Sequence, residues 1–136
     1  ISIQFCYYID SENLEKCKSL KVAKSEDRVH ASGYKWKYTE GSMVFPDPSD
    51  RPSRTILTAE GGTSPSRFKH VVEQDGQLRR LHPIELERLN GFPDDWTLEG
   101  NGLMPDVRRA FFMGNALVVG LIERVGHVLA KRMQKP

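Results

Sequence analysis

The residues of this sequence that are best suited to chemistry are basic, and most of them precede residue 81. One group alternates lysines with aromatic residues. At the period of a β-strand, Lys35 and Lys37 would share one face. The other face would carry three aromatic side chains, Tyr34, Trp36 and Tyr38. This alternation has two interpretations: a half-buried strand with a solvated lysine row, or a surface whose lysines contact nucleic-acid phosphates.

The distribution of charge along the chain supports the nucleic-acid interpretation more than the net charge does. The formal net charge is only +2, which by itself is a weak nucleic-acid signal. However, residues 51–80 contain six Lys or Arg against three acids, whereas residues 81–100 contain one Arg against five acids. The sign of the local charge therefore changes near residue 81.

The two cysteines do not define a catalytic or metal site. Cys6 and Cys17 make no metal-binding spacing with the four histidines. The sequence also lacks a glycine-rich phosphate loop, an HExxH motif and a nucleophile elbow. Cys17 lies between two lysines, but a buried thiol without a chemical role is the simpler interpretation. Taken alone, the sequence offers a candidate nucleic-acid surface and no active site.

Length and composition are those of one soluble globular domain. The 136 residues are 38% apolar and 28% charged, which excludes a disordered chain. No run approaches the roughly 20 apolar residues of a membrane span and no signal peptide is evident, so we expect no membrane partner. Because the first residue is Ile, we expect an excerpt of a longer protein, a processed chain or a separate subunit.

The pattern before residue 81 predicts a small twisted antiparallel sheet with long loops. Residues 1–9 fit a buried strand, with a helix as the alternative for so short a run. A helix from Asp10 or Ser11 to about Leu20 and a surface loop over 21–32 follow. The remaining expected elements are a strand over 34–38, a stiff proline-rich loop over 43–52, a short strand over 53–58, and a hairpin formed by 68–72 and 77–81 around Asp75 and Gly76.

Residues 79–96 form the junction of the chain. His82 is a candidate N-cap and Pro83 suits the first helical position, where its missing N–H costs nothing. Glu85 and Glu87 favour the positive end of the helix dipole. Gly91 can end this short helix in a left-handed conformation.

Helices dominate the remainder of the chain. Pro105 can open a helix through Phe111, and we expect Gly114 and Asn115 to interrupt it. A second helix from Ala116 to about Met133 carries apolar residues at helical period. Its apolar face would lack a packing partner, which predicts possible self-association of the isolated chain. The overall prediction is an α+β fold.

Three segments, in order, resemble the C-terminal part of the DNA (cytosine-5)-methyltransferases, the part that holds the ninth and tenth motifs. Residues 51–62 read RPSRTILTAEGG and resemble the motif that braces the target-recognition region. Residues 80–96 resemble the segment that returns the chain to the catalytic domain. Residues 109–119 read RAFFMGNALVV and resemble the tenth motif. The resemblance covers roughly residues 51–133, which leaves residues 1–50 as target-recognition sequence.

The resemblance implies a role in gripping double-stranded DNA for the basic residues before the junction. These enzymes rotate the target cytosine out of the duplex, so a small domain must hold the DNA opposite the catalytic domain. The candidate DNA-binding residues are Lys35, Lys37, Arg51, Arg54, Arg67, Lys69, Arg79 and Arg80. Arg54 has a second interpretation, a brace for its own loop, and Arg67 is the better candidate for a base contact.

The resemblance also implies a partial site for S-adenosyl-L-methionine, the methyl donor of the family. Gly114, Asn115 and Ala116 match the tenth motif, whose Gly-Asn turn touches this cofactor. In this interpretation, Gly114 lets the backbone approach closely and Asn115 caps the following helix or offers its amide to the ligand.

The family's catalytic parts are missing from these residues. There is no Pro-Cys nucleophile and no Gly-rich cofactor loop, so thiolate attack on cytosine C6 and methyl transfer to C5 must depend on residues outside this chain. The predicted division is 1–81 for target recognition and 82–136 for the return to the catalytic domain. We expect an inactive portion of a bacterial restriction–modification enzyme, cytoplasmic and nucleoid-associated, partnered by a catalytic portion in the same or a separate chain. The alternative is a non-catalytic DNA-binding or assembly module.

Overall fold

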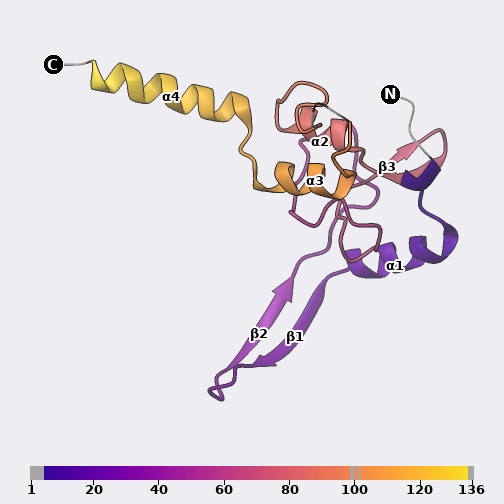
Figure 1. Ribbon diagram of the computed structural model, residues 1–136. Coiled ribbons are helices and arrows are strands. Elements are labelled where there is room, and N and C mark those ends of the chain that lie inside the picture. Colours follow the sequence, from indigo (N-terminus) through magenta and orange to yellow (C-terminus); the bar gives the residue numbers. More distant parts are fainter. Residues whose placement is uncertain (1–4, 99, 101, 135–136) are drawn as a thin grey trace.

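The protein is a central body with two projections. The computed structural model describes residues 5–98, 100 and 102–134. One projection is the hairpin of β1 (Lys24–Val29) and β2 (Lys35–Glu40). The other is the C-terminal helix α4 (Val119–Met133), which points away from the body in a different direction (Figure 1). The body between them holds the buried residues.

The N-terminal region is helical where it was expected to be a strand. Residues 1–4 lie outside the described residues, and Phe5–Tyr7 form the 3₁₀ helix η1. Tyr8 forms an isolated antiparallel bridge with Arg79 and belongs to no strand, so the strand prediction is wrong for residues 5–9. Helix α1 (Ser11–Lys21) follows as expected, because the Asp10 side chain accepts a hydrogen bond of 2.7 Å from the backbone N of Asn13.

The hairpin β1–β2 replaces a predicted loop. Residues 24–29 read KSEDRV, which shows no apolar alternation, and the loop prediction for 21–32 is therefore wrong. The register runs from Lys24 opposite Glu40 to Val29 opposite Lys35. At the base of the hairpin, the backbone N of Met43 donates to the carbonyl of Lys21 at 2.7 Å. Residues 22–42 thus leave the body and return to the same point.

The second hairpin confirms its prediction. Strands β3 (Val71–Gln74) and β4 (Gln77–Arg80) pair in antiparallel fashion. Asp75 and Gly76 connect them with φ values of 52° and 77°, the left-handed pair that a tight two-residue turn requires. The α+β prediction is confirmed, although the described strands form two separate two-stranded sheets rather than one.

The junction helix α2 (Pro83–Leu89) forms as its sequence predicts. His82 accepts through Nδ1 from the backbone N of Ile84, at 3.3 Å, and Glu85 accepts from the backbone N of His82 at 2.8 Å. This reciprocal pair is a capping box. Gly91 has a φ of 79°, consistent with the predicted left-handed stop.

The interruption between the last two helices lies later than predicted. Helix α3 (Asp106–Asn115) includes both Gly114 and Asn115, and residues 116–118 separate it from α4. By length and composition alone, Asp106–Met133 would pass as one membrane-spanning helix. The break divides this stretch into two helices, and α3 buries Ala110 and Met113 within the body, so we interpret the apolar content as packing surface.

Two clusters of apolar residues hold the body together. Cys17, Phe68 and Val71 form one under α1. The other brings Ile56 against α2 and α3, through Leu86, Ala110 and Met113. This second cluster joins residues on both sides of position 81, so the division at 81–82 stays a prediction. Helix α4 contributes no buried residue among those described.

Candidate nucleic-acid interface

The β1–β2 hairpin presents the lysines predicted from the alternation. Lys35 and Lys37 are exposed on β2, and the strand is not the half-buried element of the first interpretation. Tyr34 and Trp36 stack with ring centroids 6.3 Å apart. On the same face as Trp36, the guanidinium of Arg28 lies 3.9 Å from the centre of the Tyr38 ring.

Arg54 braces the loop in which it lies. Its Nε donates to Asp47 Oδ1 at 2.7 Å and its Nη2 donates to the carbonyl of Val44 at 3.0 Å. The other carboxylate oxygen of Asp47 accepts from the backbone N of Val71 at 2.8 Å. Residues 53–58 form no strand, contrary to prediction. Side-chain hydrogen bonds with Asp47 and His70 hold this segment instead. Of the two interpretations of Arg54, the structure favours the brace.

A buried contact between Glu60 and His70 lies in the next part of the loop. Glu60 and His70 are each about 2% exposed, with Glu60 Oε1 2.9 Å from His70 Nδ1. The same oxygen accepts from the backbone N of Lys69 and of His70, at 2.9 and 2.7 Å. Burial opposes ionisation of Glu60, but the bonds from His70 outweigh it and hold the pKa of that carboxyl below its ordinary value.

The other ring nitrogen of His70, Nε2, contacts residues 53 and 54. This nitrogen lies 3.0 Å from Ser53 Oγ and 3.1 Å from the carbonyl of Arg54. The imidazole therefore lies between residues 53–54, which its Nε2 contacts, and Glu60, which its Nδ1 approaches within 2.9 Å. The arrangement makes this irregular segment rigid, which a binding surface requires.

A cavity of about 670 Å³ opens between this loop and α3. Arg67 and Arg108 lie on its lining together with Phe111, which is 43% exposed. The loop can approach so closely because of two glycines. A Cβ on Gly61 would lie 2.7 Å from the Cα of Val107, and one on Gly62 would lie 2.5 Å from the Cβ of Arg67. The cavity thus combines cationic and aromatic groups.

Arg79 and Arg80 do not belong to an exposed surface. Both are 7% exposed. Arg79 binds Glu85 through two bonds of 2.8 Å, and Arg80 donates to the carbonyls of Gly62 and Cys6 at 3.0 Å each. Their guanidinium groups are committed to the junction, so we correct the prediction that they grip DNA.

The predicted cofactor residues lie at the end of α3 rather than at the start of α4. Gly114 packs against the backbone of the preceding loop, where a Cβ would lie 2.4 Å from the backbone N of Thr58. Asn115 is exposed and donates through Nδ2 to the carbonyl of Phe111 at 2.9 Å. It therefore does not cap the following helix, and Val118 is the N-cap residue of α4. Gly114 and Ala116 line a groove of about 530 Å³.

The other predicted residues differ in accessibility. Arg51 and Arg67 are exposed, and Lys69 is half-buried. Arg28 and Arg108 were not among the residues predicted from sequence. Arg28 lies within the predicted loop over 21–32, and Arg108 lies beyond residue 81, where the local charge changes sign. Sequence reasoning also missed Lys21, whose Nζ donates to the carbonyl of Lys69 at 2.6 Å and ties α1 to the loop.

Comparison with known proteins places this architecture in a family. The model of the C-5 cytosine-specific DNA methylases matches residues 5–131, and the chain belongs to that family. A type II methyltransferase of Staphylococcus aureus, M.Sau3AI, is 43% identical over 125 residues. That match covers 92% of this chain but only 29% of the relative's length. No solved structure matches the chain.

Proposed function

We propose that the chain is the target-recognition and C-terminal portion of a DNA (cytosine-5)-methyltransferase of a type II restriction–modification system. The observation that carries the proposal is the match itself: nearly the whole chain aligns with under a third of a type II methyltransferase. A chain of this extent can recognise DNA and complete a catalytic domain that lies elsewhere. As part of a bacterial enzyme of this type, it would act in the cytoplasm, at the nucleoid.

The DNA-binding residues of this proposal are the accessible cations. Lys35, Lys37, Arg51 and Arg67 are exposed, and Arg67 adjoins the cavity beside α3. Lysines suit the phosphates, whereas an arginine at a rigid loop suits the edge of a guanine. Rigidity comes from the Glu60–His70 pair. Lys69 is less accessible, and Arg54 acts through the loop that it braces.

The catalytic nucleophile of this proposal lies outside the chain. Cys17 is fully buried, and burial raises the pKa of its thiol, the opposite of what an attacking thiolate needs. Cys6 follows Phe5 and precedes Tyr7, so neither cysteine belongs to a Pro-Cys pair. The chain alone is therefore expected to be inactive.

The groove beside Gly114 and Ala116 fits one edge of an S-adenosyl-L-methionine site. Its lining includes Ile56, Leu117 and Val118, which suit an adenine ring, together with the polar Asn90. Asn115 leaves its Oδ1 to accept from a ligand, because Nδ2 is already bonded to Phe111. The cofactor would supply the methyl group, and the charged contacts it needs must come from the catalytic portion.

Helix α4 would dock on that catalytic portion. Five of its apolar side chains are between 45% and 59% exposed: Leu121, Ile122, Val125, Val128 and Leu129. A face of this size on a soluble protein marks a protein contact. The partner is therefore the remainder of the enzyme, in the same chain or in a second subunit.

A chimera tests the proposal directly. This chain would replace the matching segment of the Staphylococcus aureus relative, and the purified chimera would be incubated with S-adenosyl-L-methionine and DNA. We expect 5-methylcytosine by mass spectrometry, and none from the relative lacking the segment or from this chain alone. A chimera that is folded by circular dichroism, binds the cofactor and still makes no 5-methylcytosine would contradict the proposal.

A further inference from the structure

Tyr7 is a buried aromatic residue that belongs to neither apolar cluster of the body. It is 4% exposed and ends the short helix η1. Its ring packs against polar groups of the junction: the ring of His82, with centroids 5.0 Å apart, and the guanidinium of Arg80, 5.1 Å from the ring centre. A buried phenol in such surroundings needs a hydrogen-bond partner.

That partner is the carboxylate of Asp106, 99 residues further along the chain. The Tyr7 hydroxyl donates to Asp106 Oδ2 in the first turn of α3. Burial, followed by the bond to Asp106, raises the pKa of the phenol, so the hydroxyl keeps its proton and remains a donor. A hydrogen bond with a carboxylate as its acceptor is stronger than one between neutral groups.

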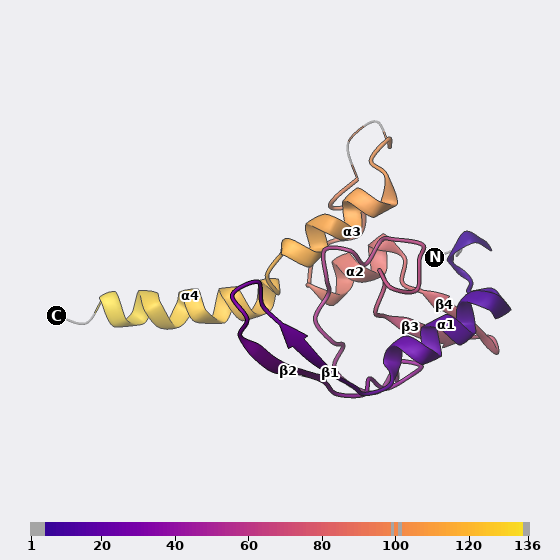
Figure 2. The same ribbon diagram turned by 90° about the horizontal axis from the view of Figure 1, so that it is seen from below.

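Backbone contacts hold the rest of the incoming segment, residues 5–9, on β4. Arg80 Nη2 donates to the carbonyl of Cys6 at 3.0 Å, and the backbone N of Ile9 donates to the carbonyl of Leu78 at 2.9 Å. In two perpendicular views, η1 (indigo) lies at the end of the body opposite α4 (Figure 1, Figure 2). The Tyr7 side chain extends this attachment from the junction to α3.

Helix α3 is fixed to the body independently of this bond. Ala110 and Met113 belong to the apolar cluster that contains Ile56, and Gly114 packs against the backbone of Thr58. The Tyr7–Asp106 bond therefore holds the incoming segment against a helix whose own position does not depend on it.

In the proposed function, the chain connects the body with the catalytic portion in two places, ahead of the incoming segment and through α3 and α4. The Tyr7–Asp106 bond joins these two connections. We propose that Tyr7 and Asp106 are positioning residues, whose hydrogen bond fixes the catalytic portion relative to the DNA held by the body. This inference rests on the proposed function, and neither residue is expected to touch the substrate.

Such a bond should act on the rate of methylation more than on DNA affinity. Reacting atoms must approach within about 3–3.5 Å, and a misplacement of about 1 Å can slow a reaction about 100-fold. The cations proposed to contact DNA belong to other segments, so their contacts should persist without the bond. Rate and affinity are therefore separate measurements of positioning and of binding.

Tyr7→Phe tests the pair, because it removes the hydroxyl and keeps the ring against His82 and Arg80. The variant is made in the chimera described above and measured with saturating S-adenosyl-L-methionine. We expect the single-turnover rate of methylation to fall roughly 10-fold or more, with the Kd for the duplex unchanged. Asp106→Ala should have the same effect, and the double variant should be no slower than either single one.

Two control variants separate positioning from general effects. Glu12→Ala removes the first-turn acid of α1, as Asp106→Ala does in α3, and should leave the rate unchanged. Val71→Ala truncates a fully buried side chain of the cluster under α1. It should lower the melting temperature at least as much as Tyr7→Phe, but leave the rate unchanged below the unfolding transition.

Three results would overturn this inference and leave the proposed function intact: an unchanged rate in Tyr7→Phe, a weaker Kd as its sole effect, or an equal loss of rate in Val71→Ala. A folded, cofactor-binding chimera that makes no 5-methylcytosine would contradict the proposed function and this inference together.

Discussion

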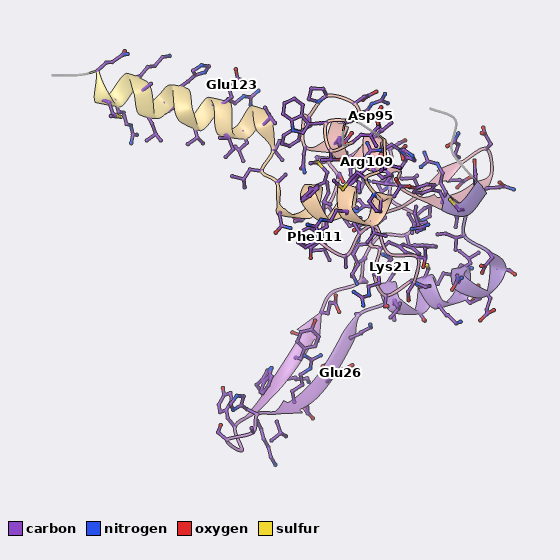
Figure 3. The ribbon with its side chains drawn as sticks, in the orientation of Figure 1. Lys21, Glu26, Asp95, Arg109, Phe111 and Glu123 are labelled. Carbon is purple, nitrogen blue, oxygen red and sulfur yellow. The ribbon has the colours of Figure 1, made fainter. Side chains whose placement is uncertain are left out.

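Arg109 and Glu87 form a fully buried ion pair that joins α3 to α2. Arg109 Nη2 lies 3.0 Å from Glu87 Oε1, and the two side chains are 5% and 0% exposed. Arg109 also contacts Asp95 at 2.9 Å, and the backbone N of Thr97 donates to Glu87 at 3.0 Å. Figure 3 shows Arg109 and Asp95 facing one another beside α3. The junction is therefore held by charge as well as by apolar packing.

Removing this charge should destabilise the protein strongly. We expect Glu87→Gln to lower the free energy of unfolding by about 3 kcal/mol, because it leaves the Arg109 guanidinium buried without its full counter-charge. Urea unfolding followed by circular dichroism measures the loss. The matched control is Glu12→Gln, which breaks a surface pair whose side chains are 81% (Glu12) and 58% (Lys16) exposed and should change stability far less. Equal losses would show that the buried pair contributes no more than the surface one.

The protein should become unstable in acid because of its buried glutamates. Burial opposes ionisation of Glu85, but hydrogen bonds from Arg79 and His82 prevail, and its pKa, like that of Glu60, lies below the ordinary value. Such groups bind fewer protons in the native state, so their stabilisation is present above the unfolded pKa, about 4.3, and is lost as the pH falls through the folded value.

The corresponding measurement is the free energy of unfolding as a function of pH. We expect a plateau from about pH 7 to pH 5.5 and a decline below about pH 5. Glu60→Gln should lower the plateau and make the acid decline shallower, since one of the responsible carboxyls is gone. An unchanged decline in that variant would exclude Glu60 as a contributor.

Gly114 should tolerate no side chain. In Gly114→Ala the new Cβ would meet the backbone of Thr58 within 2.4 Å of its N, so we expect a loss of about 2 kcal/mol or more from forced separation of α3 and the loop. Gly126→Ala is the control, because nothing lies within 4 Å of a Cβ there. It should stabilise α4 by roughly 0.5–1 kcal/mol. Thermal unfolding of both variants measures these changes in stability. An unchanged melting temperature for Gly114→Ala would contradict the close packing of Gly114 against the backbone of Thr58.

The isolated chain should self-associate through α4. Figure 2, seen from below, again shows this helix extending beyond the body. We expect sedimentation velocity to detect dimers or larger species that Leu121→Glu/Val125→Glu abolishes, because charges on the apolar face prevent its burial. Arg124→Glu/Lys131→Glu alters exposed charges of the same helix and should leave association unchanged or weaker by a small factor. A monomer at high concentration would contradict the prediction.

The parts of the fold that sequence predicted are those specified by neighbouring residues. The α2 unit needs only His82, Pro83, Glu85 and Gly91, which act within one or two turns. The β3–β4 turn likewise depends on two adjacent residues. Local chemistry of this kind can be read from a sequence because the groups that interact are fixed by their spacing.

The predictions that were wrong concern residues whose partners are distant in the sequence. Residues 53–58 resemble a strand, but their order comes from Asp47 and His70, which no spacing rule associates with them. Arg79 and Arg80 form a basic pair typical of a surface, and only the folded chain brings Glu85 and the carbonyl of Gly62 to them. At the candidate site, the DNA-binding role of the cations stays a prediction, and the accessibility of each depends on partners that are distant in the sequence.

The hydrogen bond between the Lys21 carbonyl and the Met43 amide gives the hairpin a consequence for evolution and engineering. Because residues 22–42 depart from and return to one point, they can be exchanged as a cassette, lengthened or shortened without moving either apolar cluster. Variation can accumulate in such an excursion while folding stays under separate selection. A hairpin transplanted from a relative at these two residues is therefore expected to leave the fold of the body unchanged.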